Sequence, residues 1–280
     1  MTRQKVGFQG ELGAFSEMAV LEYFGNVAEP IPHGWFDDVF RAVEQGSCDF
    51  GILPIENTLA GSIHINYDLM LEHNLQIVGE IILRIVHNLM VKPGVRREEL
   101  RKIQSHPKAL EQCVQFLRRN SKLQPETVYD TGGAAKMLSE GNAEDIGVIA
   151  STRAAEHYKL EILEAGLEDN TQNYTRFLVL AKGKSPSNGE CTKTSIVFTV
   201  PHEPGMLFKA MSAFALRDIS ISKIESRPLI GSPWEYLFYL DFQGDPNSAL
   251  CSRALDHLQE IATEFKLLGS YSEGKIVDNV

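Results

Sequence analysis

Apolar and polar residues follow two alternating patterns over the first two thirds of the chain. Short runs rich in Val, Ile and Leu, bounded by turn-forming residues, are typical of buried strands. They lie at 5–10, 50–56, 101–106, 127–130, 145–151 and 176–181. Segments with apolar residues at helical spacing lie at 16–25, 38–48, 107–119, 131–140 and 152–160. Strands that alternate with helices predict βα units around a largely parallel sheet, and Ser16 is expected to cap the first helix.

The apolar run at 76–92 is long and has no turn signal near its middle. A second strong strand, at 176–181, comes only at the end of this part of the chain. A chain that crosses to a second lobe and later returns has this pattern, whereas a single larger sheet is the alternative. We expect a first lobe from about 1–78 and 160–182, and a second lobe from about 79–159.

The segment 183–193 is polar and rich in Gly, Ser and Pro, which indicates a linker between two domains. Six further elements follow it, in the order strand, helix, strand, strand, helix, strand. They lie at 194–200, 204–218, 219–228, 234–242, 248–262 and 265–271. This βαββαβ order is typical of a ferredoxin-like α+β domain, here predicted at 194–280 after an α/β domain at 1–182.

Composition and charge narrow the functional classes. The 280 residues are 43% hydrophobic and carry a formal net charge of -10, which argues against a sequence-independent nucleic-acid binder. The four cysteines are far apart, and neither a signal peptide nor an apolar run long enough for a membrane span is visible. We therefore expect a cytosolic protein with reduced thiols and without a membrane partner.

Four strand-to-helix junctions are unusually polar and rich in small residues. They lie at 8–17, 53–62, 105–110 and 129–136. Ligands of open α/β sheets bind beyond the carboxyl ends of strands, where helix N-termini favour anions, although each junction alone is equally a tight turn. The spacing of Gly7, Gly10 and Gly13 is not the dinucleotide fingerprint, and the sequence around His202 lacks the second His of a zinc helix. No nucleotide cofactor and no metal are expected.

Several single residues allow two interpretations. His106, next to Pro107, is either a general acid or a helix cap. Asn57 either contacts a ligand or forms an Asx turn. Arg176, which directly precedes the apolar end of a strand, either binds a carboxylate in a bidentate pair or is a surface residue.

Five stretches taken together resemble one family. They read PIENTLAGS at 54–62, SHPKALEQC at 105–113, GVIASTRAAEHYKL at 147–160, NYTRF at 173–177 and PGMLFKAMSAFALRDISISKIESRP at 204–228. The chain resembles a prephenate dehydratase fused to an ACT regulatory domain. This resemblance implies a two-lobed catalytic domain similar to type II periplasmic binding proteins, followed by the ferredoxin-like ACT domain. The family's first loop usually carries Pro and Thr where this chain has Glu11 and Ala14.

The resemblance also implies an activity and a set of site residues. The reaction converts prephenate to phenylpyruvate without a cofactor, by orientation, anion binding and assistance to a departing hydroxyl. The catalytic residues it implies are Thr175, Ser105, Asn57 and Gln112. The substrate-binding residues it implies are Arg176, Phe177, Ser16, Thr58 and His106. The final proton comes from Thr175, His106 or water.

For the C-terminal domain the resemblance implies feedback inhibition by L-phenylalanine, in a homodimer or homotetramer. Residues expected to bind the effector are Gly205, Met206, Leu207, Phe208, Glu225 and Ser226. The helix start offers backbone N–H groups to a carboxylate. Two alternatives stay open: an arogenate dehydratase, and a non-catalytic carboxylate-binding sensor. A transcription factor is disfavoured because no helix-turn-helix with a basic surface is visible.

Overall fold

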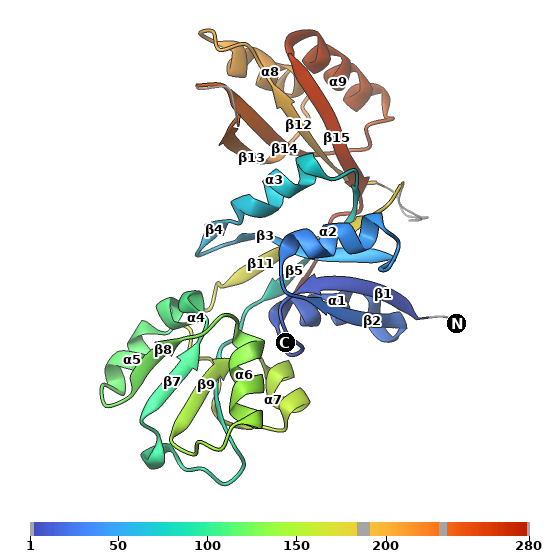
Figure 1. Ribbon diagram of the computed structural model, residues 1–280. Helices are drawn as coiled ribbons and strands as arrows, with labels where there is room; N and C mark the ends of the chain where they lie inside the picture. Colours follow the sequence, from blue (N-terminus) through green and yellow to red (C-terminus); the bar gives the residue numbers. More distant parts are fainter. Residues whose placement is uncertain (1–2, 184–190, 230–233, 279–280) are drawn as a thin grey trace. The chain divides into compact units, whose positions relative to one another are not determined.

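The computed structural model describes residues 3–183, 191–229 and 234–278 (Figure 1). The chain divides into two compact units. The N-terminal unit comprises 1–74, 81–179 and 275–280, and the C-terminal unit comprises 75–80 and 180–274. Most of the predicted linker, 184–190, lies outside the described residues. The predicted linker therefore stays a prediction.

The first lobe of the N-terminal unit is built on a mostly parallel sheet. Its strands are β5 (Gln76–Arg84, from Ile81 onward), β11 (Tyr174–Ala181), β3 (Phe50–Asn57), β1 (Gln4–Gln9) and β2 (Ala28–His33), in that order. β1 is parallel to both neighbours, β2 and β3. Two short strands extend the sheet, β4 (Gly61–Ser62) on β3 and β16 (Lys275–Val277) on β5. The carboxyl ends of β1 and β3 therefore point to the same edge of the sheet.

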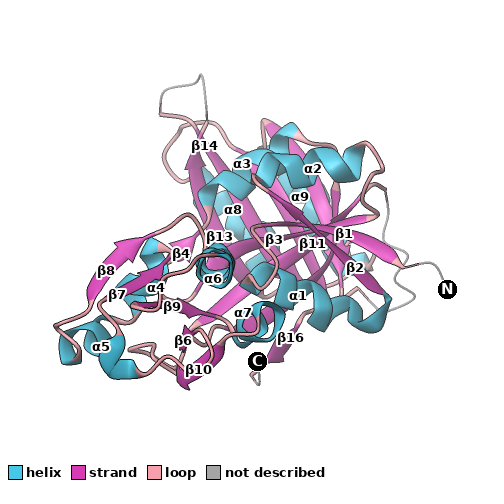
Figure 2. Ribbon diagram, turned by 60° about the horizontal axis from the view of Figure 1, so that its bottom comes forward, coloured by secondary structure: helices cyan, strands magenta, loops and turns pink. Residues whose placement is uncertain are grey.

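Helices cover both faces of this sheet (Figures 1 and 2). The first lobe contains α1 (Phe15–Phe24), η1 (Gly25–Val27), α2 (Phe36–Glu44) and α3 (His64–Glu72). The strands lie in the order β3-β1-β2, so the connection through α1, from β1 to β2, and the connection through α2, from β2 to β3, run in opposite directions across the sheet. Because both connections are right-handed, α1 and α2 lie on opposite faces. Gly51 allows α2 to approach β3 closely, because a Cβ atom there would lie 3.0 Å from Val39.

The second lobe has its own five-stranded sheet. The order is β10 (Glu161–Glu164), β6 (Asn88–Val91), β9 (Ile146–Ala150), β7 (Lys102–Ser105) and β8 (Gln124–Thr127). The turn η2 (Arg97–Glu99) and the helices α4 (Pro107–Gln112), α5 (Val114–Arg119), α6 (Thr131–Glu140) and α7 (Thr152–Tyr158) complete this lobe. Leu89 and Val91 pack with the buried residues of α4 and α5, whereas Met90 packs with those of α6 and α7. Alternation along β6 therefore serves a separate apolar core on each face.

The long strand predicted at 76–92 is in fact two strands, β5 and β6. The break is at 85–87, where the chain passes from the sheet of the first lobe to that of the second. The return follows β10, at 165–173. Both crossings fall some residues later than the lobe limits expected near 79 and 159. We call 85–87 and 165–173 the crossing segments.

Two helix predictions also differ from the structure. The helix predicted at 107–119 is divided at Cys113, because Asp169 accepts hydrogen bonds from the N–H groups of Val114 and Gln115 and so starts α5 anew. Ser16 does not cap the first helix: α1 begins at Phe15, and its N-cap, Ala14, has no side-chain cap.

The C-terminal unit contains a four-stranded antiparallel sheet with two helices. Its elements are β12 (Lys193–Thr199), α8 (Met206–Ala215), β13 (Ile221–Pro228), β14 (Tyr236–Gln243), α9 (Ala249–Ile261) and β15 (Glu264–Tyr271). The strand order is β13-β14-β12-β15. α8 and α9 pack together over Phe198, Phe214 and Phe242. The elements follow the βαββαβ order predicted from the sequence.

A buried ion pair lies inside the C-terminal unit. The Lys193 ammonium is 2.9 Å from Oε1 of Glu80, and the side chains are 8% and 0% exposed. The same oxygen accepts a hydrogen bond from the N–H of Gly274. These contacts join β12, the middle of β5 and the segment after β15, and both charges are largely shielded from bulk water. Loss of one partner would leave the other charge buried without compensation.

We expect Glu80→Gln to lower the free energy of unfolding of this unit by about 3–5 kcal/mol, because the Lys193 ammonium stays buried while its counter-charge is removed. Glu99→Gln is the matched control, since Glu99 pairs with Arg96 at the surface and such pairs contribute at most about 1 kcal/mol. Calorimetry of the full chain measures both. Equal effects of the two substitutions would contradict the importance of the buried pair.

Candidate functional site

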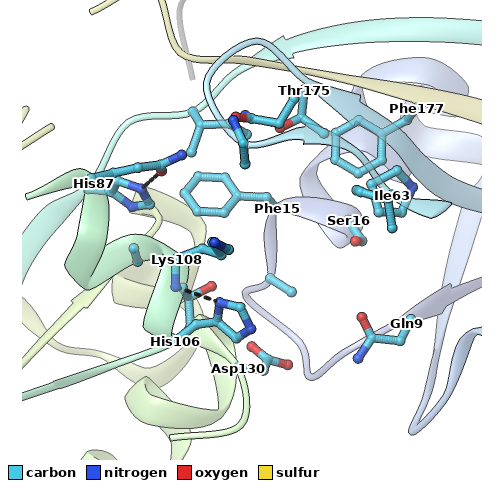
Figure 3. A pocket seen from close by; sticks show the side chains of 18 of the residues that line it. Gln9, Phe15, Ser16, Ile63, His87, His106, Lys108, Asp130, Thr175 and Phe177 are labelled. Carbon is cyan, nitrogen blue, oxygen red and sulfur yellow. Dashed lines mark hydrogen bonds between the residues drawn. The ribbon is translucent and has the colours of Figure 1, made fainter. Parts of the chain in front are cut away.

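A cavity of about 550 Å³ lies between the two lobes of the N-terminal unit (Figure 3). All four polar junctions singled out in the sequence contribute to its wall, with Gln9, Asn57, His106 and Asp130 among the lining residues. Gln9 and Asn57 end strands, His106 directly follows β7, and Asp130 lies three residues after the end of β8. The carboxyl ends of strands from both sheets therefore surround one space, as expected for a ligand site in an open α/β fold.

The start of β11 contributes two side chains to the cavity. Thr175 and Phe177 line it and are only 7% and 2% exposed. Arg176 lies between them in a strand, where neighbouring side chains point to opposite faces, and it is not among the lining residues. The predicted contact of Arg176 with a substrate carboxylate therefore stays a prediction.

The Asn57 amide organises the first-lobe wall of the cavity. Its Nδ2 donates to Asn173 Oδ1 at 2.8 Å, to Tyr174 O at 3.1 Å and to Thr175 Oγ1 at 3.0 Å. Its Oδ1 accepts the N–H groups of Leu59 and Ala60, at 3.0 and 2.8 Å. The Asx turn, one of the two alternatives considered from the sequence, is therefore present, and a contact of Asn57 with a ligand stays a prediction. All of these contacts are internal, so Asn57 positions Thr175.

Gln112 brings the second lobe into the same network. It is the last residue of α4 and lines the cavity. Its Oε1 lies 2.8 Å from His87 Nε2 and accepts a hydrogen bond from Asn173 Nδ2 at 3.0 Å. The break at Cys113 ends α4 at this point, and Asp169 N–H donates to the Gln112 carbonyl at 2.7 Å. The side chain and the backbone of Gln112 are therefore both held.

The N-terminus of α4 supplies an imidazole and a cation. His106 caps α4, with Nδ1 accepting the N–H of Lys108 at 3.2 Å, and it also lines the cavity (Figure 3). Burial lowers the pKa of His106, and the negative charge of Asp130 opposes this shift. Lys108 lines the cavity too, and its ammonium bonds to Glu111 at 2.8 Å. The two interpretations of His106, cap and site residue, are therefore compatible.

Asp130 forms the acidic part of the wall. It caps α6 by accepting the N–H groups of Gly132 and Gly133, and it accepts the N–H of Glu11 at 2.8 Å. Glu11 replaces the proline usual in this family, and proline has no N–H to donate. The Glu11 carboxylate also pairs with Lys136 at 3.1 Å. The altered first loop is thus bound to the second lobe by contacts that proline could not make.

The remaining predicted residues of this unit fall into two groups. Ser16 lines the cavity beside Phe15, as expected for a substrate-binding residue. Ser105 is fully buried, and its hydroxyl donates to Ile149 O at 2.6 Å. Thr58 is exposed and bonds to Gln172 O and Tyr174 N–H, at 2.7 and 2.9 Å. Ser105 and Thr58 hold neighbouring segments in place and do not line the cavity.

The predicted effector residues lie in the C-terminal unit. Gly205 is the N-cap of α8 with φ of 81°, a left-handed conformation that favours glycine. Leu207 and Phe208, on the first turn, are 39% and 77% exposed. Glu225 and Ser226 are on β13, and Glu225 is 3.5 Å from Lys223. The role of these residues in binding an effector stays a prediction.

Several lining residues were not predicted from the sequence, namely His87, Lys108, Asp130, Tyr129 and Phe15. A signal for one of them was present: the polar pair His87–Asn88 interrupts the apolar run at 76–92. Within the described ranges, no group of His, Cys, Asp and Glu side chains could hold a metal ion. No helix in those ranges has the length and apolar character that a membrane span requires.

Comparison with known proteins gives relatives over nearly the whole chain. Arogenate dehydratase/prephenate dehydratase 2, chloroplastic, of Arabidopsis thaliana is 45% identical over 96% of this chain and 73% of the relative. Arogenate dehydratase 2 of Petunia hybrida is 43% identical over 96% of this chain and 72% of the relative. Several Arabidopsis relatives are named chloroplastic, and this finding contradicts the expectation of a cytosolic location.

Solved structures give a consistent picture. The prephenate dehydratase of Arthrobacter aurescens, in complex with L-Phe, has a TM-score of 0.87 and 27% identity, covering 96% of this chain and 90% of that one. GqqA, described as a novel type of quorum quenching acylase, has a TM-score of 0.88 and 33% identity, covering 97% of this chain and 98% of that one.

The family profile agrees with the relatives. The match to prephenate dehydratase extends over residues 6–185, and this range includes every residue that lines the cavity. Together with 45% identity to a named dehydratase, it shows that the chain belongs to the prephenate dehydratase family.

Proposed function

We propose that the cavity of the N-terminal unit carries out the decarboxylating dehydration of prephenate, and that Thr175 hydrogen-bonds the departing hydroxyl. The observation that carries this proposal is the hydrogen bond from Asn57 Nδ2 to Thr175 Oγ1, inside a cavity that both lobes line. Membership of a dehydratase family supports the reaction class, which is that of a carbon–oxygen lyase.

The reaction requires little covalent chemistry from the protein. The bond from the ring to its carboxylate breaks and releases carbon dioxide, and that electron pair enters the ring as it becomes aromatic. The ring C–O bond breaks at the opposite carbon, and one proton converts the departing hydroxide to water. Prephenate dianion and one proton thus give phenylpyruvate, carbon dioxide and water. The protein has to orient the ring, bind two carboxylates and stabilise the departing oxygen.

Thr175 is suited to the departing oxygen because of the bond that it accepts. An Nδ2–H group of Asn57 occupies a lone pair of Oγ1, so the hydroxyl hydrogen is available to a ligand in the cavity. The site is 7% exposed, where a hydrogen bond to developing negative charge is stronger than in water. A threonine hydroxyl does not ionise near neutral pH, so Thr175 acts as a hydrogen-bond donor and transfers no net proton.

His106 contributes a second donor, in its neutral form. Its Nδ1 accepts the Lys108 N–H, which leaves the hydrogen on Nε2. Protonation of Nδ1 would abolish this helix cap, and burial already lowers the pKa of the imidazole. We therefore assign water as the source of the final proton. His106 acts as a positioned hydrogen-bond donor through its Nε2–H group.

The carboxylate groups and the ring of the substrate are expected to contact different residues of the cavity. Lys108 is the permanent cation among the described lining residues and is suited to a carboxylate. The amide of Gln112 offers N–H groups at the same wall, because its oxygen is occupied by His87 and Asn173. The rings of Phe15 and Phe177 supply an apolar surface for the substrate ring.

Arogenate is the second candidate substrate, favoured by the names of the relatives and by one residue. It carries an ammonium group where prephenate has a ketone, and the carboxylate of Asp130 lines the cavity. Amide hydrolysis, suggested by the similarity to GqqA, fits the site less well. Hydrolysis through Thr175 needs a base at its hydroxyl, whereas the partner observed there is the Asn57 amide, which donates.

We also propose that the C-terminal unit is an ACT domain that binds L-phenylalanine and thereby inhibits the enzyme. Support comes from its βαββαβ order, from the left-handed Gly205 that opens α8, and from the L-Phe complex of the Arthrobacter dehydratase. The N–H group of Leu207, on the first turn of α8, is suited to the carboxylate of the amino acid, whereas that of Met206 donates to Glu203 O at 3.3 Å. Paired ACT domains in a homodimer or homotetramer are part of this proposal.

The purified protein should form phenylpyruvate from prephenate, and Thr175→Val should lower kcat by about 10²–10³-fold. Valine keeps the shape of the side chain but removes the hydroxyl, so the loss measures the hydrogen bond to the departing oxygen. Thr175→Ser should retain most of the activity. Parallel assays with arogenate give the substrate preference as a ratio of kcat/KM values.

Thr127→Val is the control for these variants, since Thr127 is exposed at the end of β8 and does not line the cavity. Its kcat should equal that of the unmodified protein. If Thr175→Val retains full activity with a normal melting temperature, Thr175 has no role in the reaction.

His106→Asn should lower kcat/KM by about 10-fold while the melting temperature changes little, because asparagine also caps helices but has no group equivalent to Nε2–H. In the unmodified protein kcat should be constant from about pH 6.5 to 8.5, since the pKa of His106 is lowered and the imidazole stays neutral there. An acid limb that disappears in His106→Asn would instead identify His106 as the proton donor.

L-Phenylalanine should inhibit the full chain, and Gly205→Ala should bring the ratio of rates without and with L-phenylalanine toward one. A Cβ atom is strained at φ of 81°, so the N–H groups at the start of α8 would be displaced. Calorimetric titration with L-phenylalanine measures the binding itself. Unchanged inhibition in Gly205→Ala would locate the effector elsewhere.

A further inference from the structure

His87 is a buried imidazole in the wall of the cavity, next to Gln112. It lies in the crossing segment 85–87, lines the cavity and is 2% exposed, with the Phe15 ring edge-on at 5.5 Å (Figure 3). Its Nε2 is 2.8 Å from Gln112 Oε1. No described residue offers a hydrogen-bond partner to its Nδ1, which is fully buried. A buried polar atom without a partner is uncommon and calls for an explanation.

The contacts determine where the His87 hydrogen is. Gln112 Oε1 also accepts from Asn173 Nδ2 at 3.0 Å, and a carbonyl oxygen only accepts. His87 Nε2 must therefore carry a hydrogen and donate. In the neutral imidazole Nδ1 is then a bare acceptor, which matches its position without a donor. The protein uses one defined tautomer of His87.

The same contacts determine the orientation of Gln112. Two donors on Oε1 turn the NH₂ group of this amide to the other side, and Gln112 lines the cavity. Asn173 Oδ1 accepts from Asn57 Nδ2 at 2.8 Å, so the NH₂ group of Asn173 faces Gln112, and a reversed Gln112 amide would bring its own NH₂ group against that of Asn173. Donors on both sides of the contact would repel one another.

Both donors to Gln112 come from the segments that join the lobes. His87 is in the outgoing crossing segment and Asn173 is in the returning one. The two segments bond to each other through Leu167 N–H to His87 O and Ile85 N–H to Asn173 O, each at 2.8 Å. The orientation of one second-lobe amide is thus determined by the chain between the lobes.

We propose that His87 is a positioning residue whose Nε2–H holds the Gln112 oxygen, so that the Gln112 N–H groups face the substrate. This inference rests on the proposed function for the identity of the substrate, but not for the tautomer. Burial lowers the pKa of His87, while the bond to Gln112 and the charge of Glu168 oppose the shift. Glu168, the nearest carboxylate, accepts the His87 backbone N–H and lies 3.5 Å from Arg84.

A double-mutant cycle on the full chain tests this role. His87→Leu should lower kcat/KM for prephenate by about 10-fold, which corresponds to one lost hydrogen bond. In a Gln112→Leu background the same substitution should have no further effect, because the group that His87 positions is gone. His87→Gln restores a side-chain donor and should recover most of the loss. Additive effects of His87→Leu and Gln112→Leu would overturn the proposal.

The imidazole ¹⁵N shifts of His87 provide a test that is independent of turnover and of any misfolding of the variants. They should show a single Nε2–H tautomer that stays neutral above about pH 6.5, because burial lowers the pKa of His87 from its ordinary value. An Nδ1–H tautomer would overturn the proposal. If the unmodified protein fails to convert prephenate, the proposed function fails while this spectrum still decides the role of His87.

Discussion

The first-lobe wall of the cavity, which includes Thr175, depends on the hydrogen bonds of the Asn57 carboxamide. Its nitrogen donates hydrogen bonds to three acceptors, and its oxygen accepts hydrogen bonds from two backbone N–H groups. These partners belong to the turn after β3, the returning crossing segment and the start of β11, so the side chain at the end of β3 holds three other parts of the chain. An amide buried at this depth cannot lose partners cheaply, because each unsatisfied group costs about 1–3 kcal/mol. The Thr175 hydroxyl inherits its direction from this network.

The polar wall is therefore a preorganised array. Its active atoms, the Thr175 hydroxyl hydrogen and the Gln112 N–H groups, are those left over after every internal bond has been made. Such groups need no reorganisation when charge develops on a departing oxygen, which is the main advantage of a folded site over water. The apolar part of the wall, with Phe15 and Phe177, contributes shape and excludes water.

The sequence was sufficient for most of the element order and for part of the site. Periodicity located the βα units and the βαββαβ order, because both patterns depend on local burial. It failed where distant residues decide the local structure. Asp169 divides the helix predicted at 107–119, and the run at 76–92 divides where the chain changes sheets. His87 and Asp130 were missed for the same reason: each is next to the cavity only through contacts with segments far away in the sequence.

The short strand β16 has a consequence for how the protein is made. Lys275–Val277 pairs with β5 inside the N-terminal unit, although residues 180–274 of the C-terminal unit separate this strand in sequence from the rest of the N-terminal unit. A ribosome therefore releases the sequence of the C-terminal unit before the sheet of the first lobe is complete. The N-terminal unit cannot finish folding before residues 275–277 have been synthesised, and the edge of β5 stays without this partner until then.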